Sequence, residues 1–153
     1  MSLDADYLKQ ALELAYHNVN EGGRPFAAVI VQNDQVIASA VNEMHLTQDP
    51  TAHAELLAIR RASQVISLQD LKKCVVYATG QPCPMCLALI HMTGIHKVVY
   101  AYSNHDAEAY GLSTAPIYTQ IQKPLAEQAI ELHYLPVRLE KRDELYWLWT
   151  SHK

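Results

Sequence analysis

The chain has 153 residues, a length typical of one domain with a hydrophobic core of its own. Hydrophobic residues make up 50% of the chain and charged residues 18%, which excludes an intrinsically disordered protein. The formal net charge is −4 at pH 7, so the chain lacks the basic surface of a protein that grips nucleic acid, and we predict no nucleic-acid partner.

The first half of the chain predicts a helix, a β-hairpin and a second helix. Apolar residues recur at three- and four-residue spacing over residues 5–20, the pattern of an amphipathic helix. Two apolar runs, Phe26–Val31 and Val36–Val41, are separated by four polar residues, which is typical of a hairpin. A helical pattern returns over residues 53–66.

The second half continues the alternation of strands and helices. Its predicted elements are a strand over Cys74–Ala78, a helix over 84–93, a strand over Lys97–Ala101, short helices within 104–129, a fifth strand over Ile130–Tyr134 and a helix over Glu140–Thr150. This order predicts the α/β class: a three-layer α/β/α sandwich around a five-stranded mixed sheet. We expect residues 1–153 to form a single domain.

Three residues have the chemistry and spacing of a metal site. Cys83 and Cys86 form a Cys-x-x-Cys pair at a predicted helix start, where unpaired N–H groups and the helix dipole favour thiolates. His53, at the start of the other helix, supplies a third ligand. Three protein ligands leave the fourth tetrahedral position of a zinc ion open, which distinguishes catalytic from structural zinc.

Glu55 lies two residues beyond His53 and is interpreted as the proton shuttle. Zinc lowers the pKa of bound water toward about 7, and a nearby carboxylate can accept that proton and return it to the substrate. The pattern H-x-E followed by P-C-x-x-C is the signature of zinc nucleobase deaminases. We therefore predict one Zn²⁺ per chain.

Other interpretations of these residues stay open. Cys83 and Cys86 also fit a thioredoxin-like redox pair, but that leaves His53 and Glu55 unexplained. A structural zinc site lacks a convincing fourth ligand, since Cys74 lies in an apolar strand and His45 is the nearest further candidate. A non-catalytic zinc-binding module has no use for Glu55.

Longer segments carry a resemblance to a known family. They are Pro25-Phe26-Ala27-Ala28-Val29-Ile30-Val31, Asn42, Asp49-Pro50-Thr51-Ala52-His53-Ala54-Glu55 and Pro82-Cys83-Pro84-Met85-Cys86-Leu87. Over nearly its full length the chain resembles the cytidine deaminase superfamily. These motifs are similar both to bacterial guanine deaminases and to tRNA adenosine deaminases. Asp106-Ala107-Glu108-Ala109, Ile117-Tyr118 and Lys123-Pro124-Leu125-Ala126-Glu127 resemble the guanine deaminase branch.

The resemblance implies roles for particular residues. It places zinc on His53, Cys83 and Cys86, and makes Glu55 the catalytic proton shuttle. It implies that three residues bind the substrate: Asn42 by hydrogen bonds to the base, Phe26 by packing against it, and Ala54. The reaction that it implies is guanine and water to xanthine and ammonia. It also implies a homodimer, possible exchange of the C-terminal segment between subunits, and a small-molecule substrate.

The chain departs from the guanine deaminase pattern in three places. Gln81 stands where that branch has Glu, His91-Met92 stands where it has an aromatic residue, and Tyr110-Gly111-Leu112-Ser113-Thr114 lacks its carboxylate. A changed pocket can accept a different ring. Cytosine or another pyrimidine, an aminotriazine, a pterin and guanosine are therefore alternatives, beside adenosine in tRNA.

The number of cysteines and the N-terminal residues indicate the cellular compartment in which the protein works. Three cysteines, with no signal-like start at Met1-Ser2-Leu3-Asp4, argue against a disulfide framework. No stretch approaches the roughly 18 apolar residues of a membrane helix. We expect a cytoplasmic protein that does not bind membranes.

Overall fold

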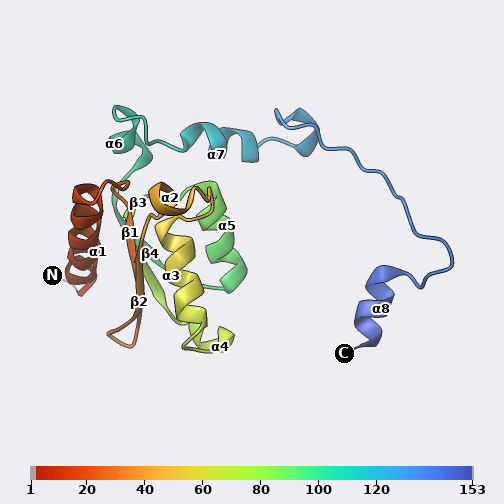
Figure 1. Ribbon diagram of the computed structural model, residues 1–153, viewed down its shortest axis with the longest axis horizontal. Helices are drawn as coiled ribbons and strands as arrows, with labels where there is room; N and C mark the ends of the chain where they lie inside the picture. The colour runs from red at the N-terminus through yellow and green to blue at the C-terminus, as the bar shows by residue number, and fades with distance from the viewer. Residues whose placement is uncertain (1–2, 153) are drawn as a thin grey trace. The chain divides into compact units, whose positions relative to one another are not determined.

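The structure is a computed structural model that describes residues 3–152. The described residues fall into two compact units, one ending at Gln122 and one beginning at Lys123. The first unit contains the sheet and the helices that cover it, and Figure 1 labels its elements in chain order.

The first unit begins with a long helix and a hairpin, as the sequence predicts. Helix α1 spans Leu3–Asn20, strand β1 spans Ala27–Gln32 and strand β2 spans Gln35–Val41. The two turn residues, Asn33 and Asp34, have φ values of 50° and 60°. Positive φ at both central positions matches the right-handed twist of the flanking strands, and Asn and Asp tolerate it better than most residues.

The sheet has four strands in the order β2-β1-β3-β4. Strand β3 spans Val75–Gly80 and strand β4 spans Val98–Tyr102. β1 is antiparallel to both β2 and β3, whereas β3 and β4 are parallel. The parallel pair is joined through helix α5, Pro84–Thr93, because parallel strands need a crossover connection.

Helices cover both faces of this sheet. Helix α1 lies on one face, and helices α3 (Ala54–Ser63) and α5 lie on the other (Figure 1). Strand β1 shows why, because successive residues point to opposite faces. Ile30 packs with α3 residues, while Val29 packs with Tyr7 and Ala11 of α1. The predicted α/β sandwich is confirmed in these three layers.

Short helices complete the described chain. In the first unit they are α2 (Met44–Thr47), α4 (Leu68–Leu71), α6 (Asn104–Glu108) and α7 (Ala115–Ile121). The second unit contains a 3₁₀ turn, η1 (Leu125–Glu127), and helix α8 (Leu145–Ser151), which is shorter than predicted. None of the described helices is both long and apolar enough to cross a membrane.

The predicted fifth strand is wrong. Residues 130–134 have no regular secondary structure and are exposed, although Ile130, Leu132 and Tyr134 alternate as strand residues do. A strand exists only when its backbone pairs with a neighbour. Among residues 3–152 the sheet contains only the strands β1, β2, β3 and β4. The backbone of residues 130–134 therefore pairs with no strand.

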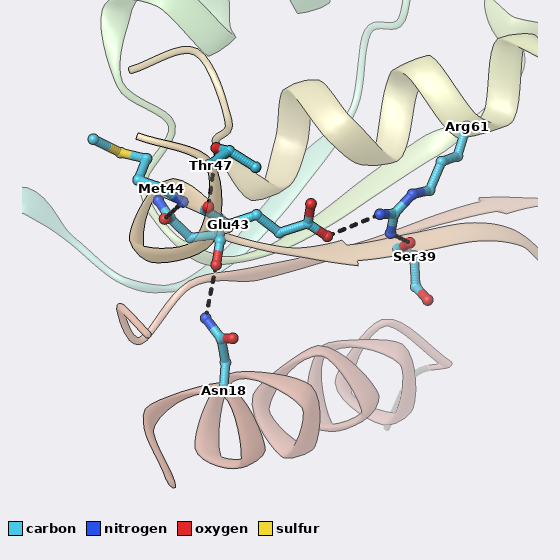
Figure 2. Close-up of polar contacts among 7 residues, drawn as sticks. Asn18, Ser39, Glu43, Met44, Thr47 and Arg61 are labelled. Carbon is cyan, nitrogen blue, oxygen red and sulfur yellow. Dashed lines mark hydrogen bonds and ion pairs between the residues drawn. The ribbon is translucent and has the colours of Figure 1, made fainter. Parts of the chain in front are cut away.

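One buried side chain ties the end of α1 to the segment that follows the hairpin. Asn18 is buried, and its amide nitrogen donates to the carbonyl oxygens of Arg24 at 2.8 Å and Asn42 at 3.0 Å. Figure 2 shows Asn18 reaching from α1 toward that segment, whose Glu43 pairs with Arg61 at 2.9 Å. Asn18 therefore holds the backbone of Asn42 in place.

We expect Asn18→Ala to lower the free energy of unfolding by about 1–3 kcal/mol, because it leaves a buried carbonyl without its donor. Urea unfolding followed by circular dichroism measures this loss. Asn20→Ala, at an exposed position of the same helix, is the matched control and should change stability by less than about 0.5 kcal/mol. Equal stabilities of the Asn18 and Asn20 variants would contradict the assigned role.

Candidate functional site

Two of the cysteines lie at the start of α5, after the loop that leaves β3. Cys83 is the N-cap residue, and its Sγ accepts a hydrogen bond from the backbone N–H of Cys86 at 3.5 Å. Pro84 follows at the first helical position, where a missing N–H costs little. Hydrogen bonds from the Cys86 thiol and from His53 lower the pKa of Cys83 to about 4. A lowered pKa favours the thiolate form of Cys83, which is the form that binds a metal ion.

His53 meets these cysteines from the other helix. It is the N-cap residue of α3, with extended backbone, and its Nδ1 lies 3.4 Å from Cys83 Sγ and 3.7 Å from Cys86 Sγ. The hydrogen bond with Cys83 raises the pKa of His53. The pKa of the buried Cys86 is raised as well, first by its hydrogen bond to the Cys83 sulfur and then by burial.

The donor set fits a zinc ion. The ligand atoms of His53, Cys83 and Cys86 all lie within 4.8 Å of one another. Zinc bond lengths of about 2.3 Å to sulfur and about 2.05 Å to nitrogen place tetrahedral ligand atoms roughly 3.5 Å apart. The observed nitrogen–sulfur distances of 3.4 Å and 3.7 Å bracket that value. One imidazole and two thiols can therefore hold one zinc ion without moving apart.

Glu55 occupies the first turn of α3, next to this cluster. Its side chain is buried, and burial is the main reason that its pKa rises to about 7. Glu55 is not one of the three clustered ligands. A carboxyl group that exchanges its proton near neutral pH, beside a metal site, is suited to general acid–base chemistry.

His53, Cys83 and Glu55 line a common pocket of about 180 Å³, whereas the fully buried Cys86 lies behind its wall. This volume is below the range of about 300–1,000 Å³ that is usual for drug-sized ligands, so the pocket suits a single small ring system. Phe26, just before β1, and Asn42, just after β2, line it. Ala54 does not line it, because its side chain is buried in the core on that face of the sheet.

Hydrogen bonds fix the position of Asn42 in the pocket wall. Its backbone N–H donates to the carbonyl of Phe26 at 3.0 Å, and its side-chain oxygen accepts from the N–H of Met44 at 3.0 Å. Together with Asn18, these contacts hold both the backbone and the side chain. Asn42 is therefore a rigid part of the wall.

A tyrosine from α7 holds the loop that carries Cys83. The hydroxyl of Tyr118 donates a hydrogen bond to the carbonyl of Pro82, and burial raises the pKa of Tyr118. The contact anchors the residue that precedes a cysteine of the cluster. Tyr118 of the Ile117-Tyr118 segment thus has a structural role beside the site.

Among the polar residues that line the pocket, sequence reasoning missed Arg24, Tyr102, Ser103 and Asn104. Asn104 follows β4 as Gln81 follows β3, and the two strands are parallel. Their carboxyl ends therefore meet at one edge, where ligands bind in open α/β sheets. A polar residue soon after each of two parallel strands was the sequence signal that could have indicated Asn104 as a pocket residue. Arg24, in a loop after Gly22-Gly23, carried no comparable signal.

The chain is similar to known deaminases. Residues 1–102 match the family described as the cytidine and deoxycytidylate deaminase zinc-binding region. Guanine deaminase of Bacillus subtilis (strain 168) is 41% identical over 128 residues, which cover 83% of this chain and 82% of that protein. The X-ray structure of guanine deaminase from Bacillus subtilis covers 96% of this chain and 93% of its own, with a TM-score of 0.85 and 38% identity.

A second group of relatives acts on RNA according to its name. The tRNA-specific adenosine deaminase of Aquifex aeolicus (strain VF5) is 32% identical over 139 residues, 91% of this chain and 88% of that protein. Three observations indicate a zinc-binding deaminase: the match to the zinc-binding region, the 41% identity to a guanine deaminase and the clustered ligand atoms. The chain belongs to the cytidine and deoxycytidylate deaminase family, whose zinc-binding region it matches over residues 1–102.

Proposed function

We propose that this protein is a zinc-dependent hydrolase that deaminates an amino-substituted nucleobase, with guanine as the preferred substrate. The balanced reaction is guanine plus water to xanthine plus ammonia. The observation that carries the proposal is the position of Glu55, buried beside the His53, Cys83 and Cys86 ligand atoms and lining the same pocket. A structural zinc site or a redox pair does not require such a carboxyl group.

The chain's own residues supply the proton transfers. A zinc ion held by His53, Cys83 and Cys86 would act as a Lewis acid that makes water a nucleophile near neutral pH. Glu55 accepts a proton from water and passes it to a ring nitrogen. It then takes the remaining proton of the new hydroxyl group on the ring carbon and delivers it to the departing amine. The bond from ring carbon to nitrogen breaks, ammonia leaves and a carbonyl remains. The pKa of Glu55, about 7, suits a group that both takes and returns a proton.

Three residues are proposed to bind the base. Phe26 offers an aromatic face to the ring, and Asn42 offers hydrogen bonds to its edge. Ala54 is the first residue of α3, so its backbone N–H has no partner within the helix, and we propose that this group, not the side chain, serves the base. Its buried methyl group takes no part.

Guanine is favoured over other rings by the relatives. The Bacillus subtilis protein named guanine deaminase is similar over most of both chains. The small pocket supports a free base rather than a larger substrate. Cytosine, an aminotriazine, a pterin and guanosine remain alternatives, since Gln81 and the 110–114 loop differ from the guanine deaminase pattern.

Deamination of adenosine in tRNA is the second candidate. The Aquifex aeolicus relative, which matches 91% of this chain, favours it. The net charge of −4 argues against it, because tRNA binding depends on Lys and Arg contacts to phosphates.

We also propose that residues 1–153 act as one deaminase domain in a cytoplasmic homodimer. The three cysteines are free thiols, as expected in a reducing compartment. Helix α8 exposes Tyr146, Trp147 and Trp149, a large apolar surface that suits a contact with a second subunit, including an exchanged C-terminal segment. Sedimentation velocity of the full chain tests this, and a monomer at micromolar concentration would reject it.

Ammonia release by the zinc-loaded protein tests the function. The panel is guanine, guanosine, cytosine, adenine, a pterin, an aminotriazine and tRNA containing adenosine. We expect the largest kcat/KM for guanine. Ammonia release from a different ring but not from guanine would support deamination and reject guanine as the substrate. No ammonia release from any compound of the panel would reject the proposed deaminase activity.

A further inference from the structure

Three side-chain amides of the pocket have a fixed orientation. The side-chain oxygens of Asn42, Gln81 and Asn104 each accept a hydrogen bond from a backbone N–H. The donors are Met44 at 3.0 Å, Asn104 at 2.9 Å and Thr114 at 3.1 Å. A backbone N–H can only donate, so the atom that it meets must be the amide oxygen. The NH₂ group of each amide therefore points away from that contact.

These NH₂ groups are available to a ligand. Over residues 3–152, none of the three donates a hydrogen bond to a protein atom, and all three residues line the pocket. Asn42 is only 2% exposed. The only wholly buried side-chain nitrogen or oxygen without a partner, among described residues, is His45 Nδ1. The nitrogen of Asn42 therefore keeps some access to solvent, and the pocket provides it.

The rest of the wall is also rich in donors. Arg24 can only donate, and the Ser113 hydroxyl oxygen accepts from the N–H of Ala115, which leaves its proton to donate. Thr114 is the exception, because its hydroxyl donates to Asn104 and keeps free lone pairs. Glu55 is the only carboxyl group among the lining residues. Away from Glu55, the pocket therefore offers mainly hydrogen-bond donors.

The geometry points to a pocket that selects rings by acceptor atoms: Asn42, Gln81 and Asn104 donate to a carbonyl oxygen and to unprotonated ring nitrogens. This inference rests on the proposed function and narrows it. The substrate class is an aminated ring that also bears a carbonyl, as guanine does. A ring with a second amine in place of the carbonyl leaves donors facing donors and binds more weakly, since unpaired buried polar groups discriminate strongly.

Binding of two purines that differ at this group tests the inference without turnover of guanine. Hypoxanthine has a carbonyl at C6 and a proton on N1, whereas adenine has an amine at C6 and an unprotonated N1. A third ligand, 6-methoxypurine, has an oxygen at C6 and an unprotonated N1, and so isolates the difference at C6. Calorimetry with the zinc-loaded protein should give a Kd for hypoxanthine at least about tenfold lower than for adenine. Equal affinities, or tighter binding of adenine, would overturn the inference even if guanine is turned over.

A variant links the preference to the amides. Asn104→Asp keeps the oxygen that accepts from Thr114 but replaces the NH₂ group by an acceptor, and an acidic residue is favourable at the start of α6. We expect hypoxanthine binding to weaken roughly 5- to 100-fold and the preference over adenine to fall by at least about tenfold. Asn33→Asp, in the exposed hairpin turn, adds the same charge elsewhere and should change neither.

The outcomes separate this inference from the proposed function. An unchanged ratio of the two affinities in Asn104→Asp, with zinc content retained, would overturn the inference alone. Hypoxanthine could be preferred in a way that depends on Asn104 while guanine releases no ammonia. That result would reject guanine as the substrate but support the selection of rings by their acceptor atoms. Failure of both purines to bind would overturn the inference, whereas the proposed function would still be decided by ammonia release from guanine.

Discussion

Replacing Glu55 with Gln should reduce ammonia release by about 10²- to 10⁴-fold while leaving zinc content and fold unchanged. Gln has nearly the same shape but cannot accept and return a proton. Burial already disfavours the charged form of Glu55 and raises its pKa to about 7, so a neutral side chain suits this position. Ammonia release, zinc analysis and thermal unfolding on the same preparation measure all three properties.

The control for this substitution is Glu13→Gln on the exposed surface of α1. It makes the same chemical change and should keep full activity. Loss of zinc together with activity in Glu55→Gln would show that Glu55 is a ligand and not the proton shuttle. Full activity in Glu55→Gln would point to a protein that does not use this site for deamination.

Replacing Cys83 with Ala should remove both zinc and activity. The remaining ligands, His53 and Cys86, cannot hold a catalytic zinc ion as three protein ligands do. We expect zinc content to fall from about one ion per chain to near zero and ammonia release to fall to background. Zinc analysis after dialysis against a weak chelator, followed by the ammonia assay, measures the effect.

Cys74→Ala is the matched control for this experiment. Cys74 is also buried and free, but it lies before β3, and its thiol donates to the carbonyl of Asp70 at 3.6 Å. The variant loses a small buried side chain and should be less stable, yet it should retain zinc and kcat. If Cys74→Ala also lost zinc, cysteine loss would be acting through the fold and the metal assignment would fail.

The local elements could be predicted from the sequence because their signals are local. The helix start at Pro84 and the hairpin of β1 and β2 depend on residues a few positions apart, and both appear where the pattern predicts. The fifth strand could not be predicted in this way. Alternating apolar residues at 130–134 satisfy the local rule, but a strand also needs a neighbour, and nothing within the segment specifies one.

The chemistry of the metal cluster can be inferred from the amino-acid sequence alone. His53 and the Cys83-x-x-Cys86 pair have ligand chemistry at a spacing that two helix starts can bring together. Glu55 was recognisable for the same reason, because it lies on the first turn that follows His53. Residue type and short spacing suffice when local helical geometry positions the side chains.

Which hydrogen-bonding groups the pocket offers to a substrate depends on how distant segments of the chain pack together. Asn104 reaches the wall because β3 and β4 are parallel neighbours, a pairing between segments that lie far apart in the sequence. The orientation of each amide depends on which backbone N–H meets it, and for Gln81 that N–H belongs to Asn104, 23 residues away. An amide carries a donor and an acceptor, and a sequence does not say which one is left free. That choice arises when the packed chain pairs one end of the amide and leaves the other for the ligand.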